Sequence, residues 1–153
     1  MIVVADTTPL NHLILIDQVG LLKALYGRVI IPQAVLSELQ NQATPASVTR
    51  WISNRPEWLE VRPASALADP SLAHLDEGER DAIILAQDLK AEVLLMDDLG
   101  GRKEAARRNL NIAGTLTVLY LGAGRGLVDD FPAILKRLLD TGFRASPRSF
   151  SFF

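Results

Sequence analysis

Acidic residues follow the apolar runs of this sequence at positions where they could share one site. The runs at residues 2–5 and 93–96 contain no polar residue, and they end at Asp6 and at Asp97-Asp98. Such unbroken runs are typical of strands buried on both faces, as in parallel sheets covered by helices. Because the carboxyl ends of parallel strands lie at one edge of a sheet, these aspartates are expected to lie close together, where open α/β sheets bind ligands.

Three further acids belong to helices predicted to begin at the same edge. Glu79 and Asp81 stand in the first turns of a predicted helix over 78–90. They are two residues apart and therefore point to opposite sides, but each flanks the apolar stripe closely enough to lean into a crevice above the sheet. Glu38 lies at the margin of the apolar face of a helix predicted over 32–40.

Four or five carboxylates in one crevice repel one another, and some must become protonated unless a cation lies between them. Ligation by oxygen alone suits Mg²⁺ or Mn²⁺. Each acid also has a purely structural interpretation: Asp6 as a helix cap, Glu79 as half of a capping box with Asp76, Glu38 as a solvated side chain, and Asp97-Asp98 as turn formers before Gly100. The order of the acids along the chain favours the shared site.

Composition limits the classes of protein that this chain can belong to. Its 153 residues are 48% apolar, which excludes a disordered chain. Cysteine is absent, which excludes disulfides, thiolate metal sites and cysteine nucleophiles. The net charge of −2 excludes a strongly basic overall footprint for nucleic acid. We expect neither a signal peptide nor a membrane-spanning helix, and a cytoplasmic location.

Alternating strands and helices predict an α/β fold in which helices cover both faces of a mainly parallel sheet. The predicted strands cover residues 2–5, 29–31, 59–61, 93–96 and 111–113, and the predicted helices cover 8–16, 18–26, 32–40, 46–53, 78–90, 115–123 and 131–141, with a basic helix from Arg102 after a Gly100-Gly101 loop. Residues 1–153 form one predicted domain. Its last residues, from about 143, are a phenylalanine-rich tail that should pack on the body or on a partner, since free aromatic surface favours association.

Four motifs together resemble the PIN domain family, in particular the compact prokaryotic branch DUF3368, and are similar to VapC-type ribonuclease toxins. They are Asp-Thr-Thr-Pro-Leu at residues 6–10, Pro-x-x-Val-x-x-Glu at 32–38, Gly-Glu-x-Asp-Ala-Ile at 78–83 and Leu-Leu-Met-Asp-Asp-x-x-Gly-Arg at 94–102. Gly114-Thr115 and residues 142–144 extend the resemblance over nearly the whole chain. No single motif is specific, whereas their order and spacing are. The resemblance implies a three-layer α/β/α PIN-like fold with a sheet of four or five strands.

The resemblance also implies a role for each acid. Asp6 is the first acid, Glu38 the second and Asp98 the last. The third is ambiguous, because Asp81 matches the aspartate of the toxins and Glu79 matches the Gly-Glu pair of this branch. The implied catalytic acids are Asp6, Glu38, Glu79, Asp81 and Asp98, and the implied ligands of Mg²⁺ or Mn²⁺ are Asp6, Glu79, Asp81, Asp97 and Asp98, although the position of Asp97 often carries asparagine or another polar residue.

The implied activity is metal-dependent hydrolysis of RNA phosphodiester bonds, leaving 5′-phosphate and 3′-hydroxyl ends. Thr7 and Thr8 stand where the family has a hydroxyl beside the metal site, and Arg102 and Lys103 are candidates for contacts with the RNA backbone. Arg107 and Arg108 are better interpreted as a solvated basic face. The toxin likeness implies a role in a type II toxin-antitoxin pair, with an antitoxin partner and a homodimer.

Two alternatives to the nuclease remain. A PIN-like chain can act as a scaffold that binds RNA or a partner without cleaving, although no acid of the pattern is missing here. Receiver domains and haloacid dehalogenase phosphatases also place aspartate after the first strand. However, receivers need paired acids and a late lysine, and the phosphatases need Asp-x-Asp, where this chain has Thr8. Both therefore fit less well.

Overall fold

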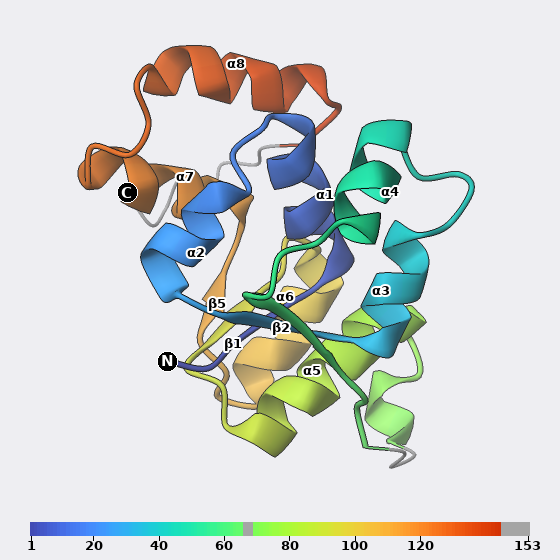
Figure 1. The fold of residues 1–153 in the computed structure, drawn as a ribbon. Helices are drawn as coiled ribbons and strands as arrows, with labels where there is room; N and C mark the ends of the chain where they lie inside the picture. Colours follow the sequence, from blue (N-terminus) through green and yellow to red (C-terminus); the bar gives the residue numbers. More distant parts are fainter. Residues whose placement is uncertain (66–68, 145–153) are drawn as a thin grey trace.

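Five parallel strands form the centre of the molecule. The computed structural model describes residues 1–65 and 69–144, and Figure 1 shows the strands between layers of helices. The strands are β1 (Val3–Ala5), β2 (Val29–Pro32), β3 (Leu59–Arg62), β4 (Val93–Leu95) and β5 (Ile112–Ala113), in the order β3-β2-β1-β4-β5. Every neighbouring pair is parallel. The predicted α/β class and the parallel sheet of four or five strands are confirmed.

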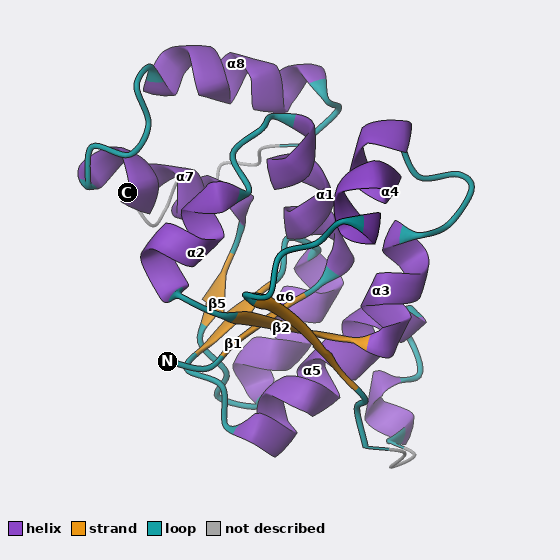
Figure 2. Cartoon of the chain, in the orientation of Figure 1, coloured by secondary structure: helices purple, strands orange, loops and turns teal. Residues whose placement is uncertain are grey.

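Helices cover both faces of this sheet (Figure 2). They are α1 (Thr7–Leu15), α2 (Gly20–Tyr26), α3 (Gln33–Leu39), α4 (Ala46–Ser53), α5 (Glu77–Leu89), α6 (Leu99–Arg107), α7 (Thr115–Gly124) and α8 (Phe131–Asp140), with a 3₁₀ turn, η1, at Pro70–Leu72. None of them is long and apolar enough to cross a membrane within the described part of the chain.

Successive strand residues point to opposite faces, which is why the strands carry unbroken apolar runs. Val3 and Ala5 pack into a core formed with α1, α2, α4 and α7. Val4, between them, packs into a second core formed with α5 and α6. Each side chain of β1 is buried whichever way it points.

The order of the strands reverses beside β1. The chain runs outward from β1 through β2 to β3, and then returns to the other side of β1 for β4 and β5. The carboxyl ends of β1 and β4 are therefore adjacent, with Ala5 opposite Leu95 in the register. This is the topological switch point at which α/β sheets bind ligands.

One local prediction is wrong. Gly100 and Gly101 belong to the first turn of α6 rather than to a loop, because Asp98 caps that helix and accepts a hydrogen bond from the amide of Gly101. Helix α1 begins at Thr7, one residue before the predicted start at residue 8, with Asp6 in the N-cap position. Because few residues separate β1 from α1 and β4 from α6, Asp6 and Asp98 each stand at the start of a helix.

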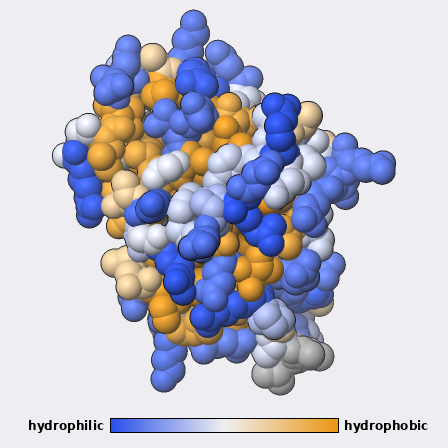
Figure 3. Space-filling view, in the orientation of Figure 1, coloured by the Kyte–Doolittle hydropathy of each residue, from blue (hydrophilic) through white to orange (hydrophobic). Residues whose placement is uncertain are grey.

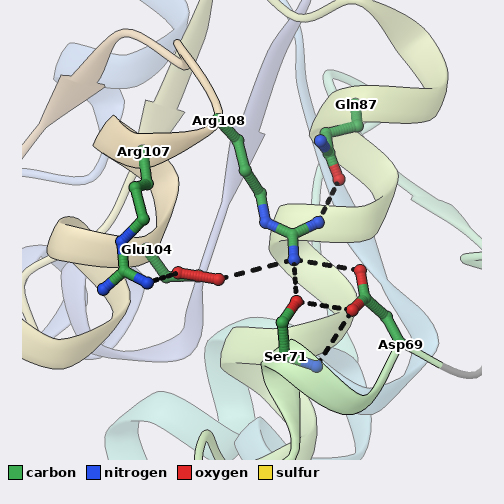
Figure 4. Close-up of polar contacts among 6 residues, drawn as sticks. All are labelled: Asp69, Ser71, Gln87, Glu104, Arg107 and Arg108. Carbon is green, nitrogen blue, oxygen red and sulfur yellow. Dashed lines mark hydrogen bonds and ion pairs between the residues drawn. The ribbon is translucent and has the colours of Figure 1, made fainter.

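Arg108 joins three segments instead of facing solvent, which corrects its interpretation as part of a solvated face (Figure 4). Its guanidinium donates to Gln87 of α5 at 2.9 Å, to Ser71 of η1 at 2.6 Å, and pairs with Asp69 at 2.9 Å. It also approaches the buried Glu104 at 3.5 Å. Arg107 is 76% exposed, as expected. Arg108 therefore holds the 69–72 segment against α5 and α6.

The predicted aromatic tail lies mostly outside the described residues, which end at Arg144. Phe143 is described, and its ring contacts the ring of His12 edge-on at a centroid distance of 5.1 Å. Nδ1 of the same histidine shares a hydrogen bond with the hydroxyl of Thr141 at 3.0 Å. The chain after α8 is thus attached to α1.

Candidate active site

Asp6 is the most buried acid at the switch point. It follows β1 directly, its amide donates to the carbonyl of Leu95 at 2.9 Å, and only 3% of the residue is exposed. Its side chain makes no capping hydrogen bond to α1, although it stands at the N-cap. Burial raises the pKa of Asp6 to about 7, and the charges of Asp76, Glu38 and Asp97 add to the shift.

Glu79 faces the same place from the first turn of α5. The pKa of Glu79 is raised to about 9, chiefly by burial and also by a hydrogen bond with Asp76 and the charges of Asp76, Asp98 and Asp6. Asp76 caps α5 as predicted, accepting from the amide of Glu79 at 2.8 Å. A carboxyl group with this pKa is mostly neutral at pH 7, because burial and the surrounding negative charge both disfavour its ionised form.

Asp98 lies at the start of α6 and accepts from the amide of Gly101 at 3.1 Å. A Cβ atom on Gly101 would lie 3.3 Å from Oε2 of Glu79 and would collide with the sulfur of Met96. The first turn of α6 therefore lies against the side chains of Met96 and Glu79. This contact brings the charge of Asp98 near Glu79.

Glu38 reaches the group from α3. A Cβ atom on Gly78 would overlap Oε1 of Glu38 and would lie 3.5 Å from Oδ1 of Asp6, so both carboxylates border the same glycine. Burial raises the pKa of Glu38, and the charge of Asp76 adds to the shift. The hydroxyl of Thr7 is buried beside Glu38 without a well-formed hydrogen bond.

Asp81 is the other candidate for the third acid and lies two residues after Glu79 on α5. Its carboxylate pairs with Nε of Arg80 at 3.1 Å. It borders a groove of about 300 Å³ between α3 and α5, together with Glu38 and Glu77. Between the two candidates for the third acid, Glu79 is the one whose charge interacts with Asp6 and Asp98.

The carboxylate of Asp97 is hydrogen-bonded to the first residue of α7. Its two oxygens accept from the amide of Thr115 at 2.8 Å and from the hydroxyl of Thr115 at 2.6 Å. Burial raises the pKa of Asp97, whereas these hydrogen bonds and the nearby charges of His12 and Arg102 lower it. Its contacts make Asp97 an anchor for α7, so that its place among the metal ligands stays a prediction.

The predicted substrate residues lie around the cluster. Thr8 is half-buried at the start of α1, and Lys103 is exposed on α6. Arg102 reaches Gly114 on the side of Asp97, where a Cβ atom on the glycine would lie 2.9 Å from Nη1. The sequence interpretation treated Asp76 only as a cap. The structure places its charge beside Asp6, Glu38 and Glu79.

The donors in this cluster fit a divalent cation by their chemistry. Asp6, Glu79 and Asp98 are oxygen donors of the kind that Mg²⁺ and Mn²⁺ prefer. Burial and the neighbouring acids raise the pKa values of Asp6 and Glu79, and a bound cation would offset both effects by favouring the ionised carboxylates. As the side chains stand, no three acidic or histidine side chains of residues 1–65 and 69–144 are gathered closely enough to hold a metal ion. A cation would have to displace protons and draw the carboxylates together.

Comparison with known proteins identifies the family and the fold of this chain. The model of the PIN domain family DUF3368 matches residues 2–153. A solved PilT N-terminus domain protein from the hyperthermophilic archaeon Sulfolobus solfataricus P2 is similar in fold, with a TM-score of 0.57, 18% identity, and coverage of 78% of this chain and 92% of that chain. None of the curated proteins matches the chain. The family match spans nearly every residue, and the chain therefore belongs to the PIN domain family.

Proposed function

We propose that this PIN domain is a metal-dependent ribonuclease. The observation that carries the proposal is the group of Asp6, Glu79 and Asp98 at the switch point, where mutual repulsion and burial hold two carboxyl groups partly protonated. Metal-dependent nuclease activity is general in the family to which the chain belongs. RNA as the substrate rests on the resemblance to ribonuclease toxins.

Each acid has a distinct part in the proposed reaction. Asp6, Glu79 and Asp98 would hold one or two Mg²⁺ or Mn²⁺ ions. When bound, these ions supply Lewis acidity to the scissile phosphate and its attacking water. Oε1 of Glu38 would accept a proton from that water, because a raised pKa suits a carboxylate to act as a base. The hydroxyl of Thr7 would orient the water or a phosphate oxygen. The oxygen of the water would bond to phosphorus as the bond from phosphorus to the 3′ oxygen breaks, the 3′ oxygen would take a proton from solvent water, and a 5′-phosphate would remain.

The test is cleavage of an end-labelled single-stranded RNA by the purified chain with Mn²⁺, with Mg²⁺ and with EDTA. Cleavage is expected with either cation, and the products should be substrates for enzymes that require a 5′-phosphate. Asp6→Asn should abolish cleavage without unfolding the chain. RNA that stays intact with both cations while the protein binds it would favour the scaffold instead.

A toxin role, an antitoxin partner and a homodimer are further parts of the proposal. Apolar surface lies over α2, α7 and α8 (Figure 3), where the exposed large hydrophobic residues are Tyr120, Leu121, Leu127 and Leu139. Such a surface is larger than scattered single residues and suits association. The mass in solution, measured by light scattering, tests the dimer. Growth arrest on expression of the intact chain but not of Asp6→Asn tests the toxin.

A further inference from the structure

A small cavity of about 40 Å³ lies beside the acidic cluster, on the side of Asp97. Arg102 and Arg144 both line it, together with Thr117 and Gly114. These residues come from α6, from α7 and from the segment after α8. The site is therefore formed by residues that are far apart in the sequence. The cavity has room for a few waters or for one phosphate group, but not for a nucleobase.

Space for the two arginines depends on Gly114. A Cβ atom there would lie 2.9 Å from Nη1 of Arg102 and 2.7 Å from Oδ1 of Asp97. Both distances are shorter than ordinary carbon contacts, so any side chain would push the guanidinium or the carboxylate away. The glycine thus leaves Arg102 facing the cavity while Asp97 holds the start of α7.

Arg144 is brought to the same cavity by its neighbours in the chain. Phe143 packs edge-on against His12 at 5.1 Å, and Thr141 shares a hydrogen bond with the same ring at 3.0 Å. These contacts attach the backbone just before Arg144 to α1. The side chain itself is exposed at the mouth of the cavity.

The charge of this cavity differs from that of the acidic cluster. Among the described residues that line it are two arginines, Arg102 and Arg144, and one carboxylate, Asp97, whose oxygens accept two hydrogen bonds from Thr115. The cavity is therefore suited to an anion. Guanidinium groups bind phosphate oxygens through paired, charge-assisted hydrogen bonds, and the hydroxyl of Thr117 adds a neutral donor.

We propose that this cavity is a phosphate subsite, in which Arg102, Arg144 and Thr117 hold a backbone phosphate of RNA adjacent to the one that is cut. The inference rests on the proposed ribonuclease function. Asp97 lines the subsite and is followed directly in the chain by Asp98, one of the acids that would hold metal, so the subsite lies beside those acids. A polyanion drawn to an acidic site needs positive charge beside it, and this subsite supplies that charge.

The experiment measures binding of a fluorescein-labelled single-stranded RNA by anisotropy, at several salt concentrations, in EDTA and again with Ca²⁺. Arg144→Ala is expected to weaken binding about tenfold and to reduce the slope of log K against log salt by about 0.7 to 1. Arg137→Ala removes the same charge from an exposed position on α8 and should change neither. Arg144→Lys should restore the slope but only part of the affinity, since lysine lacks the paired donors.

The outcomes separate this subsite from the nuclease activity. In cleavage assays Arg144→Ala should raise KM with little change in kcat. If the intact chain cleaves RNA and Arg144→Ala binds and cleaves equally well, or if Arg137→Ala has the same effect, the subsite is refuted and the nuclease stands. If RNA binding depends on Arg144 but no cleavage occurs, the subsite stands and the nuclease fails. Absence of any RNA binding refutes both.

Discussion

The carboxylate of Glu38 lies against the backbone of Gly78, so closely that a Cβ atom on the glycine would overlap Oε1. Glycine at this place lets α3 bring its acid to the cluster formed around Asp6. Nothing about the helical conformation of Gly78 requires a glycine, because its φ is not positive. The requirement is space for a carboxylate.

Gly78→Ala should therefore reduce RNA cleavage without reducing stability. The methyl group displaces Glu38, and a displacement of about 1 Å at a reacting group can lower a rate by about a hundredfold. Alanine in a helix is better than glycine by up to about 1 kcal/mol, so the unfolding midpoint should stay or rise. Gly20→Ala is the control, because nothing lies within 4 Å of its Cβ position. Full activity in Gly78→Ala would show that Glu38 is not needed.

The third acid is expected to be Glu79. Glu79→Gln should lower cleavage on the order of a hundredfold. Asp81→Asn should lower it less than about tenfold, because Asp81 pairs with Arg80 and faces the groove beside α3. Initial rates at saturating Mn²⁺ distinguish the two. A larger loss in Asp81→Asn than in Glu79→Gln would reverse the assignment.

The stability of the metal-free chain should fall as pH rises. The pKa of Asp6 is raised from 3.8 to about 7, and that of Glu79 from 4.5 to about 9, so the folded state keeps protons that the unfolded state has lost. Their contribution is complete below the unfolded pKa values and disappears as pH rises through the folded values. Thermal unfolding in EDTA between pH 6.5 and 9 measures this.

Asp6→Asn and Glu79→Gln should each flatten that pH dependence, since neither amide titrates. Asp88→Asn is a control, because Asp88 lies far along α5 on its exposed side. A midpoint that rises with pH in the intact chain would contradict the raised pKa values. An equal slope in all variants would assign the effect to other groups.

Millimolar Mn²⁺ or Mg²⁺ should raise the unfolding midpoint of the intact chain, and more at pH 8 than at pH 6. A ligand that binds only the folded state stabilises it, and cations compete here with the protons on Asp6 and Glu79. Asp6→Asn should lose most of the increase. No increase at either pH, together with a more stable Asp6→Asn, would show that the acids do not form a metal site.

Arg108→Ala should destabilise the fold by about 2–4 kcal/mol. The substitution removes one of the two arginines that pair with Glu104, whose side chain is 4% exposed, and it also removes the contacts of Arg108 with Asp69 and Ser71. Arg107→Ala removes an exposed ion pair with the same Glu104 and should cost less than about 1 kcal/mol. Urea unfolding compares the two. Equal losses would mean that the network in Figure 4 contributes no more than a surface pair.

Much of this molecule could be predicted from the residues alone, because local physics decides it. Val3, Val4 and Ala5 form a buried strand since an unbroken apolar run suits a sheet covered on both faces. Asp76 caps α5 because an N-cap acid satisfies amides that the helix itself cannot. The order and spacing of the four motifs predicted the PIN domain family, and the match over residues 2–153 confirms it.

Tertiary structure decided which of these groups meet. Glu79 and Asp81 are equally placed on their helix, and only the approach of α6 at Gly101 selects Glu79 as the neighbour of Asp98. Arg108 looked solvated because its partners Asp69 and Gln87 lie 39 and 21 residues away in the chain. Side-chain pairing across such separations depends on how the helices cover the sheet, and local sequence patterns carry no information about it.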